Sequence, residues 1–185
     1  MVAVLIQVLP FFAVIALGYL AGRTGFFSEA ATAALTKFVF YFALSAMLLR
    51  FSATLNLGDV VSWPFIWAYL IGTSAIYIVA TIVALVRRIG VEQAAVEAQC
   101  AVIGNTGFLG VPMLALLFGE EAIGPVMLCL AVDLVVFSSL IVILITGTRD
   151  GRVSPKVLGT VAMGLVKNPM IVSIVAGFSW SATGI

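Results

Sequence analysis

Five long apolar segments limit the folds that this chain can adopt. A helix needs about 20 mostly apolar residues to cross the hydrocarbon core of a membrane, and the five segments approach or exceed that length. They run approximately over residues 2–22, 31–49, 64–86, 98–118 and 122–146, and a sixth apolar segment begins at Pro169 and continues to Ile185. Because lipid offers no hydrogen-bond partners, the backbone of each segment must pair internally. The pattern therefore predicts an all-α integral membrane protein.

The composition supports lipid as the solvent. Hydrophobic residues make up 63% of the sequence and charged residues only 9%, whereas soluble domains carry roughly 45–50% apolar and about 25% charged residues. The formal net charge of +1 gives no reason to expect a nucleic-acid partner. The sequence has no histidine, and no nucleophile–base pair or metal-ligand cluster is visible in it. We therefore expect neither an enzyme nor a protein that binds a metal or a cofactor.

Positive charges gather on one side of the predicted spans. Seven Lys and Arg residues lie in the loops of that side: Arg23, Arg87, Arg88, Arg149, Arg152, Lys156 and Lys167. Only Arg50 lies in a loop of the other side. Short cytoplasmic loops of membrane proteins are enriched in Lys and Arg. We therefore expect a multi-pass protein of the plasma or inner membrane, with its N-terminus outside and the loop 147–168 in the cytoplasm.

The spans divide the chain into three parts. Residues 1–146 hold the first five spans, residues 147–168 form the cytoplasmic loop, and residues 169–185 form the sixth span. Within the loop, apolar residues recur at helical spacing, at Val157, Leu158, Val161, Leu165 and Val166. This spacing indicates either a short amphipathic helix in the membrane interface or a simple helical linker.

The sixth span repeats a feature of the first, in which a proline is followed eight residues later by glycine and then by an aromatic residue. The matching residues are Pro10, Gly18 and Tyr19 in the first span and Pro169, Gly177 and Phe178 in the sixth. This repeated spacing either is a chance similarity or marks the start of a second repeat. Five spans invert the direction of the next repeat, which is the plan of many transporters. On that plan we expect a fragment of a longer protein, with roughly four further helices to follow.

The fourth span contains residues that break helices. Gly104, Gly107, Gly110 and Pro112 fall near its middle. Each glycine destabilises a helix by about 1 kcal/mol relative to alanine, and proline does so by about 3 kcal/mol. Backbone groups that are freed in lipid must be satisfied by protein or by water in a cavity. The cluster indicates either an unwound stretch that lines a polar site or a proline kink whose glycines allow close helix packing.

An unwound stretch at this depth would create a site for an anion. Pro112 suits the first residue of a second half-helix, whose positive end would point at the middle of the membrane. Such an end favours a carboxylate or another anion, and Asn105 and Thr106 supply hydrogen-bonding groups beside it. The candidate substrate-binding residues are Asn105, Thr106, Gly107, Gly110, Pro112 and, unless it is only a packing residue of the second span, Ser45.

Asp133 lies near the centre of the fifth span. A charge there is unfavourable by about 2.5–3.5 kcal/mol, so the acid is expected to face the protein interior. It is either the group that binds a coupling proton or cation, or a structural acid that is hydrogen-bonded to the unwound stretch.

Four stretches carry a resemblance to a known family. They are GYLAGR at 18–23 with GFFS at 25–28, LTKFVFYFAL at 35–44, NTGFLGVP at 105–112 and KNP at 167–169. With these stretches the chain resembles a bacterial-type member of the auxin efflux carrier family of membrane transport proteins. The resemblance runs along the whole chain and corresponds to the N-terminal portion, somewhat over half, of a typical member.

The resemblance implies ten helices in two inverted five-helix repeats, in a fold related to that of bile-acid transporters. This chain would hold the first repeat, with its broken fourth helix, and the first helix of the second repeat. The resemblance also implies a crossover site between broken helices four and nine, and transport of organic carboxylates. Asn105 and Pro112 match the family's crossover motif and take its site role from that match. Ser45 departs from the pattern, since many members carry proline there.

The predicted function is that of a secondary active transporter that carries a small organic anion by alternating access around the broken helix. Its partners would be a small carboxylate, membrane lipid, a coupling proton or Na⁺ and, in a homodimer, a second copy of the chain. Two alternatives stay open. A channel would show conductance without a turnover limit, and a non-transporting membrane sensor or scaffold would bind substrate without flux.

Overall fold

The computed structural model describes residues 2–149 and 155–184, and every regular element in these residues is a helix. The predicted all-α membrane fold is confirmed, because five stretches are long and apolar enough to cross a membrane. They are Val4–Arg23, Glu29–Thr54, Trp63–Val86, Val91–Phe118 and Glu120–Thr148. Part of the predicted cytoplasmic loop, including Arg152, lies outside the described residues.

The spans are built from segments of unequal length. The first three spans and their connection contain α1 (Val2–Arg23), α2 (Glu29–Phe38), η1 (Val39–Ala43), α3 (Leu44–Thr54), α4 (Leu57–Val60) and α5 (Trp63–Val86). The fourth and fifth contain α6 (Val91–Val102), η2 (Thr106–Gly110), α7 (Val111–Phe118), η3 (Glu120–Ala122), α8 (Ile123–Val132), η4 (Asp133–Phe137) and α9 (Ser138–Arg149). The last two helices are α10 (Pro155–Lys167) and α11 (Pro169–Ser181).

The helices α10 and α11 meet at a bend of 59°. Asn168 forms the corner, where its side-chain oxygen accepts a hydrogen bond of 2.9 Å from the N–H of Met170 and caps α11. Pro169 follows at the first turn, where its missing N–H leaves no bond unmade. The two helices together are long and apolar enough for one further, bent span. The placement of α10 in the membrane interface stays a prediction.

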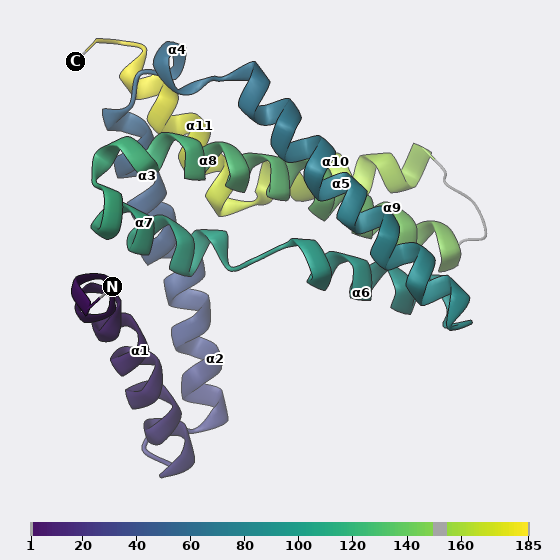
Figure 1. The fold of residues 1–185 in the computed structure, drawn as a ribbon, viewed down its shortest axis with the longest axis horizontal. Helices are drawn as coiled ribbons and strands as arrows, with labels where there is room; N and C mark the ends of the chain where they lie inside the picture. Colours follow the sequence, from purple (N-terminus) through teal and green to yellow (C-terminus); the bar gives the residue numbers. More distant parts are fainter. Residues whose placement is uncertain (1, 150–154, 185) are drawn as a thin grey trace.

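The helices α3 and α11 pack side by side, although they come from distant parts of the sequence (Figure 1). At their closest approach, a Cβ added to Gly177 would overlap the hydroxyl oxygen of Ser52 and lie 2.6 Å from the carbonyl oxygen of Leu49. Ser181 donates a hydrogen bond of 2.7 Å to the backbone oxygen of Leu55. Small residues therefore bring the sixth helix against the second span, as they do in many membrane helix pairs.

Figure 1 shows α1 and α2 extending together as an arm away from the other helices. The apolar stretch of α1 is unburied along its whole length, which suits a surface that faces lipid or further protein. The remaining helices enclose two apolar clusters of buried residues. One contains Leu44, Leu48, Val111, Ile123, Val126, Met127, Leu130, Met170 and Ile174, and the other contains Tyr77, Ala98, Val132 and Phe137.

Three spans contain a π-helical turn at an interior position. These turns are η1 in the second span, η2 in the fourth and η4 in the fifth. A serine hydroxyl follows two of them: Ser45 donates to the backbone oxygen of Phe40 and Ser138 to that of Asp133, each over 3.1 Å. Single π-helical turns inside α-helices occur frequently at functional sites. Two of the three turns, η2 and η4, meet at the candidate site described below.

Candidate functional site

The fourth span is interrupted near its middle. The helix α6 ends at Val102, residues 103–105 are not helical, and the chain becomes helical again at Thr106. Figure 1 shows the gap as an extended thread between α6 and α7. The interruption that the glycines and the proline predict is therefore present in the structure.

The second half-helix, formed by η2 and α7, begins earlier than the sequence predicts. It begins at Thr106, and Pro112 lies one to two turns further on, within the first turn of α7. Asn105 provides the physical reason. Its side-chain oxygen accepts a hydrogen bond of 3.2 Å from the N–H of Phe108, and its backbone oxygen accepts one of 3.0 Å from Gly110. This cap stabilises a helix start that needs no proline.

The N-terminal end of the half-helix offers free donors. The first N–H groups of any helix lack an acceptor in their own helix. Since Asn105 caps Phe108, the N–H groups of Thr106 and Gly107 have no partner among the described residues. The partial positive charge of the helix end adds to these donors. This end of the half-helix can therefore stabilise a negative charge.

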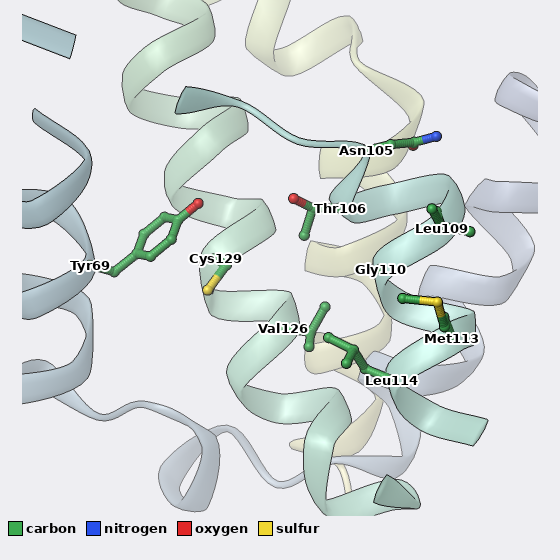
Figure 2. A pocket seen from close by; sticks show the side chains of 9 residues that line it. All are labelled: Tyr69, Asn105, Thr106, Leu109, Gly110, Met113, Leu114, Val126 and Cys129. Carbon is green, nitrogen blue, oxygen red and sulfur yellow. The ribbon is translucent and has the colours of Figure 1, made fainter. Parts of the chain in front are cut away.

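A cavity of about 330 Å³ lies beside this helix end. Its lining residues are Tyr69, Asn105, Thr106, Leu109, Gly110, Met113, Leu114, Val126 and Cys129 (Figure 2). The volume is at the small end of the range of about 300–1,000 Å³ that is typical of small-molecule sites. Three of the sequence candidates, Asn105, Thr106 and Gly110, therefore share one cavity.

The other three candidates lie elsewhere. Gly107 is buried, and a Cβ added to it would lie 3.0 Å from the terminal methyl group of Met170, so this glycine packs against α11. Pro112 lies in the first turn of α7 and does not line the cavity. Ser45 is 7% exposed, its hydroxyl is bonded within its own span, and it does not line the cavity either.

Asp133 is not among the residues that line the cavity, and it is only 3% exposed. Its Oδ1 accepts a hydrogen bond of 2.9 Å from the hydroxyl of Tyr69, and its Oδ2 accepts one of 3.2 Å from the hydroxyl of Thr106. The carboxyl group thus joins the third span, the start of the half-helix and the π-helical turn of the fifth span. This geometry is that of a structural acid bonded to the interrupted stretch, and it leaves a coupling role as a prediction.

Tyr69 is a hydrogen-bonding residue of the site that sequence reasoning misses. Figure 2 shows its hydroxyl turned toward that of Thr106 across α8. In the sequence, Tyr69 is one more aromatic residue in an apolar span that also contains Trp63 and Trp67. The available signal was indirect, because a buried tyrosine hydroxyl usually finds a hydrogen-bond partner and a buried acid in lipid needs one.

A second cavity, of about 590 Å³, lies on the other side of Asn105. Figure 2 shows the Asn105 amide group pointing away from Tyr69 and Cys129. The lining residues of this second cavity are Pro10, Phe11, Val14, Ile15, Asn105, Phe108, Leu109 and Leu116. Asn105 is the one amide among the apolar side chains of this lining. It borders both cavities. In residues 2–149 and 155–184, no group of three His, Cys, Asp or Glu residues could hold a metal ion.

Comparison with known proteins shows which family the chain belongs to. The model of the family described as "Membrane transport protein" matches residues 3–185. The chain belongs to this family. The match confirms the family predicted from the sequence motifs, and it places the chain among multi-pass membrane transport proteins rather than enzymes.

A named relative of this membrane transport protein adds a comparison of length. A protein of Rhizobium meliloti (strain 1021), described as "Putative malonate transporter", is 27% identical over 175 residues. The alignment covers 92% of this chain and 54% of the relative. The chain therefore spans about half the length of the curated relative that it matches.

Proposed function

We propose that this chain supplies the anion-binding half of a secondary active transporter for a small carboxylate. The observation that carries the proposal is the interruption at residues 103–105, which sets the N-terminal end of a half-helix beside a cavity inside an apolar span. Free backbone N–H groups inside a membrane are unfavourable unless a ligand, water or protein satisfies them. A carboxylate satisfies both these donors and the partial positive charge of the helix end.

The relative supports the class of substrate. Its printed name refers to malonate, a small dicarboxylate. The cavity beside Thr106 is small, and apart from Tyr69, Asn105 and Thr106 its lining is apolar or weakly polar. A compact acid with few polar groups fits such a lining better than a sugar or a nucleotide does.

Transport by alternating access requires a second element that faces the first. We propose that this element comes from a second, inverted five-helix repeat, of which residues 169–185 form the first helix. A second broken helix would then complete the crossover beside Asn105 and Pro112. Two copies of the complete protein would form a homodimer, with the unburied face of α1 as a candidate contact.

Asp133 is the proposed coupling group for a proton, with Na⁺ as the alternative ion. An ionised carboxylate accepts hydrogen bonds at both oxygens, whereas a protonated one also carries a donor. Protonation would therefore rearrange the bonds that Tyr69 and Thr106 make with Asp133. Because Thr106 also lines the cavity, this rearrangement reaches the substrate site directly.

The proposed orientation follows from the loop charges. Seven Lys and Arg residues lie on one side and Arg50 alone on the other, so the loop 147–168 faces the cytoplasm and the N-terminus faces outside. The plasma or inner membrane is the proposed location.

The test is uptake of labelled malonate and other small carboxylates by proteoliposomes that contain the complete gene product. Two variants separate anion binding from helix capping. Asn105→Asp keeps an oxygen that can cap the half-helix but adds a negative charge, whereas Asn105→Ala removes the cap. We expect saturable uptake by the unaltered protein and loss of uptake in both variants, with normal membrane insertion of Asn105→Asp. Unchanged uptake by Asn105→Asp would overturn the proposal.

A further inference from the structure

The hydrogen bonds around Asp133 fix the direction of two hydroxyl protons. A hydroxyl group has one proton to donate and two lone pairs that can accept. Tyr69 directs its proton to Oδ1 of Asp133 and Thr106 directs its proton to Oδ2. Both residues also line the cavity (Figure 2). While Asp133 is a carboxylate, the two hydroxyls can therefore offer only lone pairs to a molecule in the cavity.

The opposite polarity is found at the start of the half-helix. There the N–H group of Thr106, a residue that lines the cavity, has no partner among the described residues. The remaining lining includes Met113, Leu114 and Val126, which neither donate nor accept strongly. The cavity thus has a donor end, an acceptor side and an apolar remainder.

From this arrangement we propose that the site selects carboxylates that also carry a hydrogen-bond donor, and that Tyr69 is the specificity-determining residue that accepts it. The inference rests on the proposed function and names the substrate class within it. The carboxylate of such an acid meets the helix end, and its hydroxyl, amino or protonated second carboxyl group donates to the hydroxyl oxygen of Tyr69. A dicarboxylate such as malonate would meet this requirement in its singly protonated form, whose second carboxyl group carries a donor.

Asp133 is a positioning residue in this proposal, because it acts through Tyr69 and Thr106. The substitution Asp133→Asn replaces one carboxylate oxygen with an amide nitrogen, which donates and does not accept. The hydroxyl that faces this nitrogen can no longer direct its proton to residue 133. That proton then turns to the cavity, where it favours an acceptor on the ligand.

The test compares pairs of acids in which a hydroxyl group, which can donate, takes the place of a keto group, which cannot, such as lactate with pyruvate and 3-hydroxybutyrate with acetoacetate. Binding of each acid to the purified complete carrier is measured by equilibrium competition. A neutral hydrogen bond contributes roughly 0.5–1.5 kcal/mol, so the unaltered protein should bind each hydroxy acid up to about tenfold more tightly than its keto partner. The ratio of two affinities does not depend on the fraction of protein that is folded.

The deciding variant is Tyr69→Phe, with Tyr77→Phe as the matched control. Tyr77 lies two turns further along the same helix, where its hydroxyl bonds to the backbone oxygen of Ala95 and its ring packs on Phe137. We expect the ratio of hydroxy-acid affinity to keto-acid affinity to fall to about one in Tyr69→Phe and to be retained in Tyr77→Phe. In Asp133→Asn this ratio should shift in favour of the keto acids.

The outcomes distinguish the two proposals. A ratio near one in the unaltered protein, or a ratio that survives Tyr69→Phe, overturns the role of Tyr69 and leaves carboxylate transport standing. If none of the four acids, nor malonate, binds to the unaltered protein, the proposed function itself fails.

Discussion

The hydroxyl of Thr106 donates a hydrogen bond of 3.2 Å to Oδ2 of Asp133, and these two residues begin the π-helical turns of the fourth and fifth spans. The bond therefore ties the start of the half-helix to the interior of the neighbouring span. A change in the hydrogen bonds of Asp133 therefore alters the contacts of Thr106, the first residue of the helix end that is proposed to meet the substrate.

Removal of this bond should reduce both stability and transport. Thr106→Val keeps the β-branched shape but removes the donor, so one oxygen of the buried Asp133 loses its partner. An unsatisfied buried acceptor destabilises a protein by about 1–3 kcal/mol. We expect a lower melting temperature in detergent and strongly reduced uptake.

The control for this change is Thr81→Val. Thr81 also lies in a span, but its hydroxyl donates to the backbone oxygen of Tyr77 in its own helix, over 2.8 Å. The Thr81→Val protein should transport normally. Equal effects of the two substitutions would show that Thr106 has no special link to Asp133.

Asp133→Asn should separate substrate movement from its driving force. The amide cannot gain and lose a proton as the carboxyl group does, so accumulation driven by a proton gradient should be lost. Exchange of internal for external substrate needs no net proton transfer and should continue. The measurement is uptake by proteoliposomes with and without an imposed pH gradient, and gradient-driven accumulation by the variant would remove Asp133 from the coupling step.

The contact between α3 and α11 predicts a strong effect of one methyl group. Gly177→Ala places a Cβ against Ser52 and the backbone of Leu49, and such overpacking destabilises by about 1–3 kcal/mol. Gly72→Ala, in α5, is the matched control because nothing lies within 4 Å of the added carbon. We expect the melting temperature to be lowered by Gly177→Ala and to be unchanged or raised by Gly72→Ala. Equal melting temperatures would mean that α11 does not pack against α3 as described.

The charge asymmetry of the loops predicts an orientation that cysteine labelling can test. The protein with Cys100 and Cys129 replaced receives one new cysteine, at Ser154 in the charged loop or at Ser62 before α5. A membrane-impermeant thiol reagent applied to intact cells should label the cysteine at 62. It should label the one at 154 only after permeabilisation. The reverse pattern would contradict the assigned orientation.

Local features of the sequence were sufficient for much of the fold. The length of each apolar segment predicts the spans, and the glycines around Pro112 predict the interruption, because both depend on neighbouring residues alone. The predicted start of the half-helix, at Pro112, is six residues after the observed start at Thr106, because the cap made by Asn105 decides where the helix begins.

Contacts between distant residues could not be predicted in the same way. Tyr69 and Asp133 are 64 positions apart, and nothing in their spacing indicates that their side chains meet. Gly107 carries the same helix-breaking signal as Gly110, yet it packs against Met170 while Gly110 lines the cavity. The difference arises from how α7, α8 and α11 pack together, which is a property of the whole fold.

The most direct test of the account is the access of water and substrate to the interrupted span. A cysteine at Gly110 would line the cavity, and its Cβ would meet Thr106 only at an ordinary distance of 3.6 Å. In the complete carrier lacking Cys100 and Cys129, we expect a water-soluble thiol reagent to label this cysteine and a carboxylate that is transported to protect it. A cysteine at Ile76, on the exposed apolar face of α5, should stay unlabelled. A folded Gly110→Cys protein that is inert to the reagent, or is labelled equally with and without carboxylate, would contradict an anion site at this interruption.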